Sequence, residues 1–254
     1  MRILVVNDDG IDAKGLRTLV QVLSSEHEVY VCAPMYERSA AGHSVTYFKG
    51  DIITKRREVE GAVSAWAVDG TPADCTYYGL FAFYEGKIDL VVSGINHGAN
   101  LSTDVLYSGT VGAAMEGVVQ EVPAIAVSLC SHEVYPFDTA AQYALKMIPL
   151  YMKDPDAGKY VLSINVPAME EIKGIRVTHM EGLRDYRKNV RLRMIDEKNG
   201  VLICRNQPVK TLIEDYDKRG DVTAVSEGYV SLTPLYMDLT DHEREASLSK
   251  IWES

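Results

Sequence analysis

The chain has 254 residues, of which 46% are hydrophobic and 24% charged, a composition typical of soluble globular proteins and far from disordered or fibrous chains. It carries 26 Lys and Arg against 36 Asp and Glu. The formal charge of −10 therefore disfavours binding to a nucleic acid polymer or to an anionic membrane. Four widely separated cysteines form no zinc or disulfide pattern, as in proteins of a reducing compartment. With no signal-like segment and no apolar run of about 18 residues, we expect a cytoplasmic protein.

Short β-branched runs alternate with longer helical patterns over the first two thirds of the chain. The runs predict strands at 3–6, 28–32, 88–92, 124–128 and 160–166, and the patterns between them predict helices at 14–25, 72–84, 109–121 and 137–152. Several of these strands are apolar at successive positions, which is typical of central strands covered on both faces. The alternation predicts an α/β fold, with a parallel sheet flanked by helices and a catalytic core at residues 1–168.

Two segments depart from this alternation. Residues 45–68 read as a β-hairpin insertion around Lys55-Arg56-Arg57, with a turn at Glu60-Gly61. Residues 169–254 read as a β-rich appendage that is not an independent domain. In this appendage Asn199-Gly200 predicts a two-residue hairpin, and a final helix is expected at about 241–252. An exposed hairpin has edge strands that need covering, so we interpret this arm as an oligomerisation element.

Oxygen-rich segments follow three of the predicted strands, where an open parallel sheet binds its ligands. The first strand is followed by Asn7-Asp8-Asp9-Gly10, the second by a loop with Arg38-Ser39, and the third by Ser93-Gly94-Ile95-Asn96. Oxygen donors from Asp8, Asp9, Ser39 and Asn96 would form a hard site suited to Mg²⁺ or Mn²⁺. The alternative is a simple turn whose two aspartates cap the next helix.

A helix start at Ser108-Gly109-Thr110 is the second candidate feature. Ser108 is a good N-cap, Gly109 lets the backbone approach a ligand, and free N–H groups at such a start bind phosphate. An ordinary capped helix is the alternative, and the segment matches neither an ATP-binding phosphate loop nor a dinucleotide fingerprint. His43 and His97 fall in loops at the same sheet edge. Each could donate a proton to a phosphate or leaving oxygen, or serve a structural role.

These segments together resemble one known family. The ordered combination closely resembles the SurE family of survival-protein nucleotidases over residues 1 to about 240. Its segments are Val5-Val6-Asn7-Asp8-Asp9-Gly10, Ala33-Pro34 with Arg38-Ser39, Gly70-Thr71-Pro72-Ala73-Asp74-Cys75, Val92-Ser93-Gly94-Ile95-Asn96, Tyr107-Ser108-Gly109-Thr110 through Glu116-Gly117, and Ser231-Leu232-Thr233-Pro234-Leu235. Six segments in order are far more specific than any one alone. The sequence departs from the family at Ser102, where many members have glycine, and follows it loosely over 177–193.

The resemblance implies a Rossmann-like core and a metal-dependent phosphatase, a phosphoric monoester hydrolase. Its substrates would be nucleoside 5′- and 3′-monophosphates, and in some members short polyphosphate. By similarity the metal ligands fall on Asp8, Asp9, Ser39 and Asn96. The phosphate contacts fall on Ser108, Gly109 and Thr110, with Asn96 beside them. A homodimer or homotetramer with an exchanged C-terminal arm is also implied.

The implied mechanism uses Asp8, Asp9 and Asn96 as catalytic residues. A metal-activated water would attack phosphorus in line with no covalent intermediate, and Asp9 would orient or deprotonate that water. Base recognition would come from loop aromatics such as Tyr36, Tyr107 or Tyr135.

Other classes of protein fit less well. A receiver domain needs an aspartate where the third strand ends, and a haloacid-dehalogenase phosphatase needs Asp-x-Asp instead of adjacent acids. A non-catalytic nucleotide or phosphate sensor and an oligomeric stress scaffold remain as alternatives, and neither would release phosphate.

Overall fold

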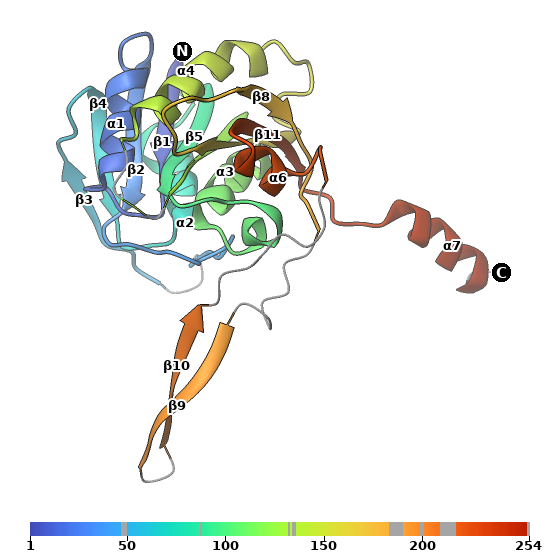
Figure 1. The fold of residues 1–254 in the computed structure, drawn as a ribbon. Helices are drawn as coiled ribbons and strands as arrows, with labels where there is room; N and C mark the ends of the chain where they lie inside the picture. Colours follow the sequence, from blue (N-terminus) through green and yellow to red (C-terminus); the bar gives the residue numbers. More distant parts are fainter. Residues whose placement is uncertain are drawn as a thin grey trace.

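The computed structural model describes residues 1–46, 50–86, 88–131, 133, 136–182, 190–198, 201–208 and 217–252 (Figure 1). Its centre is a nine-stranded sheet with the order β3-β4-β2-β1-β5-β6-β7-β11-β8. The strands of this sheet are β1 (Arg2–Val6), β2 (Glu28–Pro34), β3 (Thr54–Arg57), β4 (Ala62–Val68), β5 (Leu90–His97), β6 (Ala124–Cys130), β7 (Tyr160–Pro167), β8 (Gly174–Val177) and β11 (Tyr229–Tyr236). The run from β4 to β7 is parallel throughout, which confirms the predicted α/β class.

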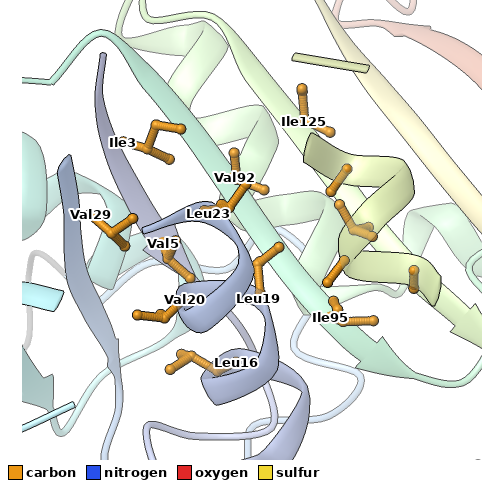
Figure 2. Close-up of a cluster of buried hydrophobic side chains, with 14 of the residues drawn as sticks. Ile3, Val5, Leu16, Leu19, Val20, Leu23, Val29, Val92, Ile95 and Ile125 are labelled. Carbon is orange, nitrogen blue, oxygen red and sulfur yellow. The ribbon is translucent and has the colours of Figure 1, made fainter. Parts of the chain in front are cut away.

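Helices cover both faces of the sheet. Those of the core are α1 (Lys14–Leu23), α2 (Pro72–Tyr78), α3 (Gly109–Val119), α4 (Asp138–Tyr151) and α6 (Asp221–Ser226), with a π-helical segment η1 (Gly79–Phe83) and a 3₁₀ segment η2 (Ser102–Leu106). One core cluster lies under α1 and α4, and the other lies under α2 and α3. In Figure 2, Leu16, Leu19 and Leu23 of α1 point at β1, β2 and β5. Their spacing is that of a single helix face, so burying that face fixes α1 on the sheet.

Two predicted elements end elsewhere than expected. The strand predicted at 88–92 continues to His97, because Asn96 and His97 pair with Ser128 and Leu129 of β6 after a local irregularity. Asn96 therefore lies on the strand and not in a loop. The single helix predicted at 72–84 ends as α-helix at Tyr78 and continues as η1. At that point Gly79 packs so closely on Leu4 that a Cβ would lie 2.7 Å from its side chain.

The hairpin predicted at 45–68 forms as β3 and β4, but it is not a separate insertion. Its two strands pair antiparallel, and β4 also pairs in parallel with β2 from Val29–Ala62 to Pro34–Val68. The alternating pattern of this segment marks the two strands, whereas only the paired register shows that they extend the main sheet. The polar character that suggested an insertion reflects its position at the sheet edge, where Lys55 and Arg56 of β3 are exposed.

The C-terminal third is divided between the sheet and two projecting elements. β11 pairs antiparallel with β7, and β8 pairs in parallel with β11, so both extend the core sheet. β9 (Val190–Lys198) and β10 (Val201–Pro208) form a separate two-stranded hairpin that points away from the core (Figure 1). Lys198 pairs with Val201, while the predicted turn residues Asn199-Gly200 lie outside the described residues. Helix α7 (His242–Trp252), predicted from about 241, also projects and has no buried residue.

The strand order creates a switch point beside β1. The chain moves from β1 to β2 on one side and returns to β5 on the other, so β1 lies between β2 and β5. In open sheets of this kind, the crevice at the carboxyl ends of such strands binds ligands. Among the described residues, no helix combines the length and apolar character required to span a bilayer.

Candidate active site at the carboxyl ends of β1 and β5

Asp8 is the buried centre of the candidate site. It follows β1 and is only 4% exposed, and its Oδ1 accepts a hydrogen bond from the Thr110 hydroxyl at 2.5 Å. Gly109 lies directly against the same side chain, since a Cβ at Gly109 would be 2.8 Å from the Asp8 Cβ. The structure thus brings the first acidic residue onto the N-terminus of α3, although 102 positions separate Asp8 from Thr110.

Both adjacent carboxyl groups have raised pKa values. Burial raises the pKa of Asp8 from 3.8 to about 6 against the opposing effect of the Thr110 hydrogen bond, and the charge of Asp9 adds to the increase. Burial also raises the pKa of Asp9, and the nearby Glu37 carboxylate contributes in the same direction. Among the described residues, no lysine or arginine forms an ion pair with either group.

The N-terminus of α3 offers donors beside Asp8. The Ser108 side chain caps the helix by accepting from the Val111 N–H at 3.1 Å, and the Ser108 carbonyl accepts from Gly112. Within the described part of the chain, the Gly109 N–H has no hydrogen-bond partner, whereas the Thr110 N–H donates to the Asp8 carboxyl and opposes the rise of its pKa. Free N–H groups at a helix start bind anions. Ser108 serves as the cap that the sequence predicted.

The end of β5 closes the other side of the site. The His97 backbone N–H donates to Asp9 Oδ2 at 3.3 Å, which holds the second acid at β5. Asn96 is half-buried, and its Nδ2 donates to the Gly98 carbonyl at 2.9 Å, so its Oδ1 is the atom available for a ligand. The His97 ring turns away to the Glu133 carbonyl at 3.0 Å.

Ser39 lies on a loop that touches Asp8 through the backbone. The Arg38 N–H donates to the Asp8 carbonyl at 2.7 Å, so Ser39 is one residue from a direct contact with the acidic pair. Its own hydroxyl is exposed and donates to Glu37 Oε1 at 2.7 Å. The Arg38 side chain forms an ion pair with Asp69, with 2.7 Å between Nη2 and Oδ1.

The donor set fits a hard divalent cation. Across the described residues, no cluster of three or more His, Cys, Asp and Glu side chains could hold a metal. A metal here would therefore need the neutral oxygens of Ser39 and Asn96 beside Asp8 and Asp9. Burial raises the pKa of both aspartates, and a cation bound beside them would favour their charged forms. A cation held by a few protein oxygens, with positions left for water and phosphate, is typical of Mg²⁺ and Mn²⁺.

Glu37 and Asn7 were not expected in the site. Glu37 precedes Ser39 by two positions and accepts a hydrogen bond from its hydroxyl. The sequence could have indicated this residue, because a carboxylate lies two positions from a proposed metal ligand. Asn7 is fully buried. Its Nδ2 shapes the turn by donating to Gly10 at 2.9 Å, and its Oδ1 is buried with no hydrogen-bond partner among the described residues. The aromatics Tyr36 and Tyr107 are 64% and 53% exposed, while Tyr135 lies outside the described residues.

The fold and site define a doubly wound α/β protein with a carboxylate- and hydroxyl-lined site at its switch point. The model of the family described as survival protein SurE matches residues 3–187. Two similar relatives are both named 5′-nucleotidase SurE. The one from Desulforamulus reducens is 42% identical over 98% of both chains, and the one from Pelotomaculum thermopropionicum is 43% identical over 99% of this chain and 95% of that one.

A solved structure of a SurE protein has the same fold. The crystal structure of the SurE protein from Aquifex aeolicus superposes with a TM-score of 0.83 at 34% identity, covering 99% of each chain. The chain belongs to the SurE family.

Proposed function

We propose that this protein is a metal-dependent phosphatase that hydrolyses nucleoside 5′- and 3′-monophosphates to nucleoside and phosphate. The carrying observation is the contact between the buried Asp8 carboxyl and the Gly109–Thr110 start of α3. This contact supports a cation site at Asp8 beside an anion site at the start of α3. The names of the relatives, 5′-nucleotidase, support the substrate class. Short polyphosphate is a further candidate substrate.

The metal ligands in this proposal are Asp8, Asp9, Ser39 and Asn96, with Mg²⁺ or Mn²⁺ as the ion. When bound, the ion would supply Lewis acidity, neutralising phosphate charge and lowering the pKa of a water molecule. Without a cation, the two carboxylates would repel a substrate phosphate at the adjacent helix start. The same acidic pair that binds the ion therefore makes phosphate binding depend on it.

The protein groups have separate roles in hydrolysis. The Gly109 N–H at the start of α3 binds a non-bridging phosphate oxygen, where negative charge develops in the transition state. The Thr110 hydroxyl is already directed at Asp8 and keeps that carboxyl oriented. Asp9, held by the His97 N–H, orients the attacking water and accepts its proton. Asn96 Oδ1 completes the ligand set from β5. None of these roles requires a covalent phosphoenzyme.

The proposal also covers the binding partners, the location and the assembly of the protein. Nucleoside monophosphates are small anions, and the charge of −10 gives no general affinity for nucleic acid polymers. We propose a cytoplasmic homodimer or homotetramer in which the β9–β10 hairpin and α7 provide subunit contacts. The exposed apolar side chains of α7 support this part of the proposal.

Replacing Asp9 with Asn tests the proposal directly. Phosphate release is measured from a panel of nucleoside 5′- and 3′-monophosphates with Mg²⁺, with Mn²⁺ and with chelator. We expect metal-dependent release by the native protein and a loss of at least about 100-fold in Asp9→Asn, since both a ligand and the proton acceptor are altered. Asp12→Asn is the matched control, because Asp12 is an exposed carboxylate on the following turn that pairs with Arg57.

Two results would contradict the proposal. Full activity of Asp9→Asn at saturating metal would remove Asp9 from the site. Absence of phosphate release by the folded native protein with either metal would favour a nucleotide sensor, which nucleotide binding by calorimetry would then identify.

A further inference from the structure

The loop of residues 38–46, named here the Ser39 loop, begins in a strained backbone conformation. Its first N–H, from Arg38, is bound to the Asp8 carbonyl at 2.7 Å. Ala40 then adopts a φ of 58°, in the left-handed region that is unfavourable for a residue other than glycine. Within the loop, the Ala41 N–H donates to the Arg38 carbonyl and the Ser44 N–H to the Ala41 carbonyl, both at 3.3 Å. A strained conformation persists only where the surrounding structure supports it, and the shorter hydrogen bonds of this loop are made to the rest of the protein.

The middle of the Ser39 loop lies directly on α3. The Gly42 N–H donates to the Tyr107 carbonyl at 2.9 Å. The loop backbone also packs on Gly112, where a Cβ would lie 2.9 Å from the Gly42 carbonyl carbon and 3.0 Å from the His43 Cα. The absence of a side chain at Gly112 therefore allows this approach, and the loop rests one turn beyond the phosphate-binding start of the helix.

A buried carboxylate on α3 holds the loop at His43. Glu116 is 4% exposed, and its Oε2 lies 2.8 Å from Nε2 of His43, whose side chain is 29% exposed. Its other oxygen accepts from the Gln120 amide at 2.8 Å. Burying a carboxylate is costly unless it is hydrogen-bonded, and both oxygens of Glu116 are. The proposed hydrolysis gives Glu116 no role, so its function lies in binding the loop.

A second buried carboxylate, on α2, holds the end of the loop. Asp74 is fully buried, and it accepts from the Thr46 N–H at 2.8 Å and from the Thr46 hydroxyl at 2.7 Å. The same side chain accepts from the Thr71 N–H at the start of α2. The loop is thus fixed to both helices that cover this face of the sheet. The loop therefore has two attachments, His43 to Glu116 and Thr46 to Asp74, and in each a loop residue hydrogen-bonds to a buried carboxylate.

We infer that His43 and Thr46 are positioning residues that, through Glu116 and Asp74, hold the Ser39 loop so that Ser39 stays beside Asp8. The inference rests on the proposed function, because it assigns Ser39 to the metal. Neither residue touches the reacting atoms. Groups that orient metal ligands without binding the metal typically contribute 10- to 100-fold to metal affinity. Releasing the loop should therefore weaken metal binding more than it slows the bound enzyme.

The substitutions His43→Ala and Thr46→Val test this from the loop side, leaving Glu116 and Asp74 in their helices. Mn²⁺ binding is measured by calorimetry, and phosphate release is measured against Mn²⁺ concentration. For His43→Ala we expect Mn²⁺ affinity about tenfold weaker, a matching rise in the Mn²⁺ concentration for half-maximal activity, and a much smaller change in kcat at saturating metal. The double variant should bind more weakly than either single variant.

His179→Ala is the matched control. Its Nε2 also lies 2.8 Å from a carboxylate, that of Asp217, but on the surface of the C-terminal region. It should bind Mn²⁺ as the native protein does. Hydrogen exchange of the metal-free proteins gives a readout independent of activity. The Arg38 and Gly42 amides should exchange at least about tenfold faster in His43→Ala and at the native rate in His179→Ala, because opening the loop exposes both hydrogen bonds.

The possible failures are distinguishable. Native Mn²⁺ affinity and native exchange rates in the folded double variant would overturn the inference while leaving the nucleotidase proposal intact. Faster exchange with unchanged Mn²⁺ affinity would overturn the link between the loop and the metal. A native protein that neither binds Mn²⁺ nor releases phosphate would refute the proposed function itself.

Discussion

At the scale of single residues, Asp8 shows how a side chain of the binding site lowers the stability of the metal-free protein. Its side chain is 4% exposed beside a second carboxyl, and burial raises its pKa from 3.8 to about 6. Below pH 3.8 the carboxyl is protonated in both the folded and the unfolded chain. Between 3.8 and about 6 the folded protein retains a proton that the unfolded chain releases, so the free energy of unfolding falls as pH rises.

Replacing Asp8 with Asn should stabilise the metal-free protein at pH 7.5 by about 3 kcal/mol. This is the free energy that corresponds to a rise of the Asp8 pKa from 3.8 to about 6. The Thr110 hydroxyl can donate to the amide oxygen as it does to Oδ1 of Asp8. Urea unfolding with chelator at pH 7.5 and pH 4 measures the difference, which should nearly disappear at the lower pH.

Added Mn²⁺ should reverse this order, because an ion that binds only the folded state stabilises the native protein and not the variant. Equal unfolding free energies of both proteins at pH 7.5 with chelator would show that Asp8 is not destabilised by burial.

Ser102 has a backbone conformation in the left-handed region, which the sequence indicated only indirectly. The resemblance to the family leads us to expect glycine at this position, and in this chain Ser102 has a φ of 53°. Its N–H donates to Asp221 at 2.7 Å and its hydroxyl donates to the Gly182 carbonyl. Asp221 lies 119 positions away in the sequence and Gly182 lies 80 positions away. The departure was therefore visible in the sequence, but the contacts that hold a serine in this conformation were not.

At the scale of elements, the start of α3 depends on the lack of a side chain at Gly109. A Cβ there would lie 2.8 Å from the Asp8 Cβ and 3.0 Å from Pro72 of α2. Neither neighbour is the flexible end of a long side chain. An added methyl group must therefore displace either the helix start or the acid.

The substitution Gly109→Ala should reduce phosphate release by about 10- to 100-fold, because displacements of about 1 Å in a reactive geometry carry losses of this size. Steady-state kinetics with saturating metal measure the loss, and circular dichroism should show an unchanged helix content. Val119→Ala, at an exposed position of the same helix, serves as the control. Native activity of Gly109→Ala would mean that substrate does not bind at this helix start.

The predictable parts of the fold are those encoded locally. β-Branched runs placed β1, β2, β6 and β7 within about two residues, since central strands need such side chains on both faces. The pairing of β4 with β2 and of β11 with β7 depends on registers between distant segments, and no local pattern encodes them. The site divides in the same way: strand ends indicated Asp8, Asp9 and Asn96, whereas the contact of Asp8 with Thr110 and the two attachments of the Ser39 loop became visible only in the fold.

At the scale of the whole molecule, α7 projects from the core, and none of its described residues is buried. Leu248, Ile251 and Trp252 are 46%, 67% and 80% exposed, and their spacing places them along one helix face. In Figure 1 the helix stands well away from the sheet. Exposed apolar stripes of this kind mark protein interfaces. This supports the proposal that α7 packs against another copy of the chain.

A chain ending at Met237 should therefore sediment as a smaller species than the native protein, with the core still folded. Analytical ultracentrifugation measures the assembly, and thermal unfolding checks the core. Leu248→Glu with Trp252→Glu should act in the same direction as the truncation. The control pair Ser249→Ala and Lys250→Ala leaves the apolar side chains of α7 in place and should not. An unchanged sedimentation coefficient after truncation would remove α7 from the subunit interface.

The position of β11 between β7 and β8 has a consequence for synthesis. Once the ribosome has released residue 167, six parallel strands can assemble, but β7 must wait until Tyr229–Tyr236 has emerged before its free edge is paired. Three strands are made in the interval: β9 and β10 pair with each other, and β8 pairs with β11, so that edge stays open. An unpaired strand edge is a template for aggregation. A nascent or prematurely terminated chain would therefore pass through its most vulnerable state late, when most of its sheet is already built.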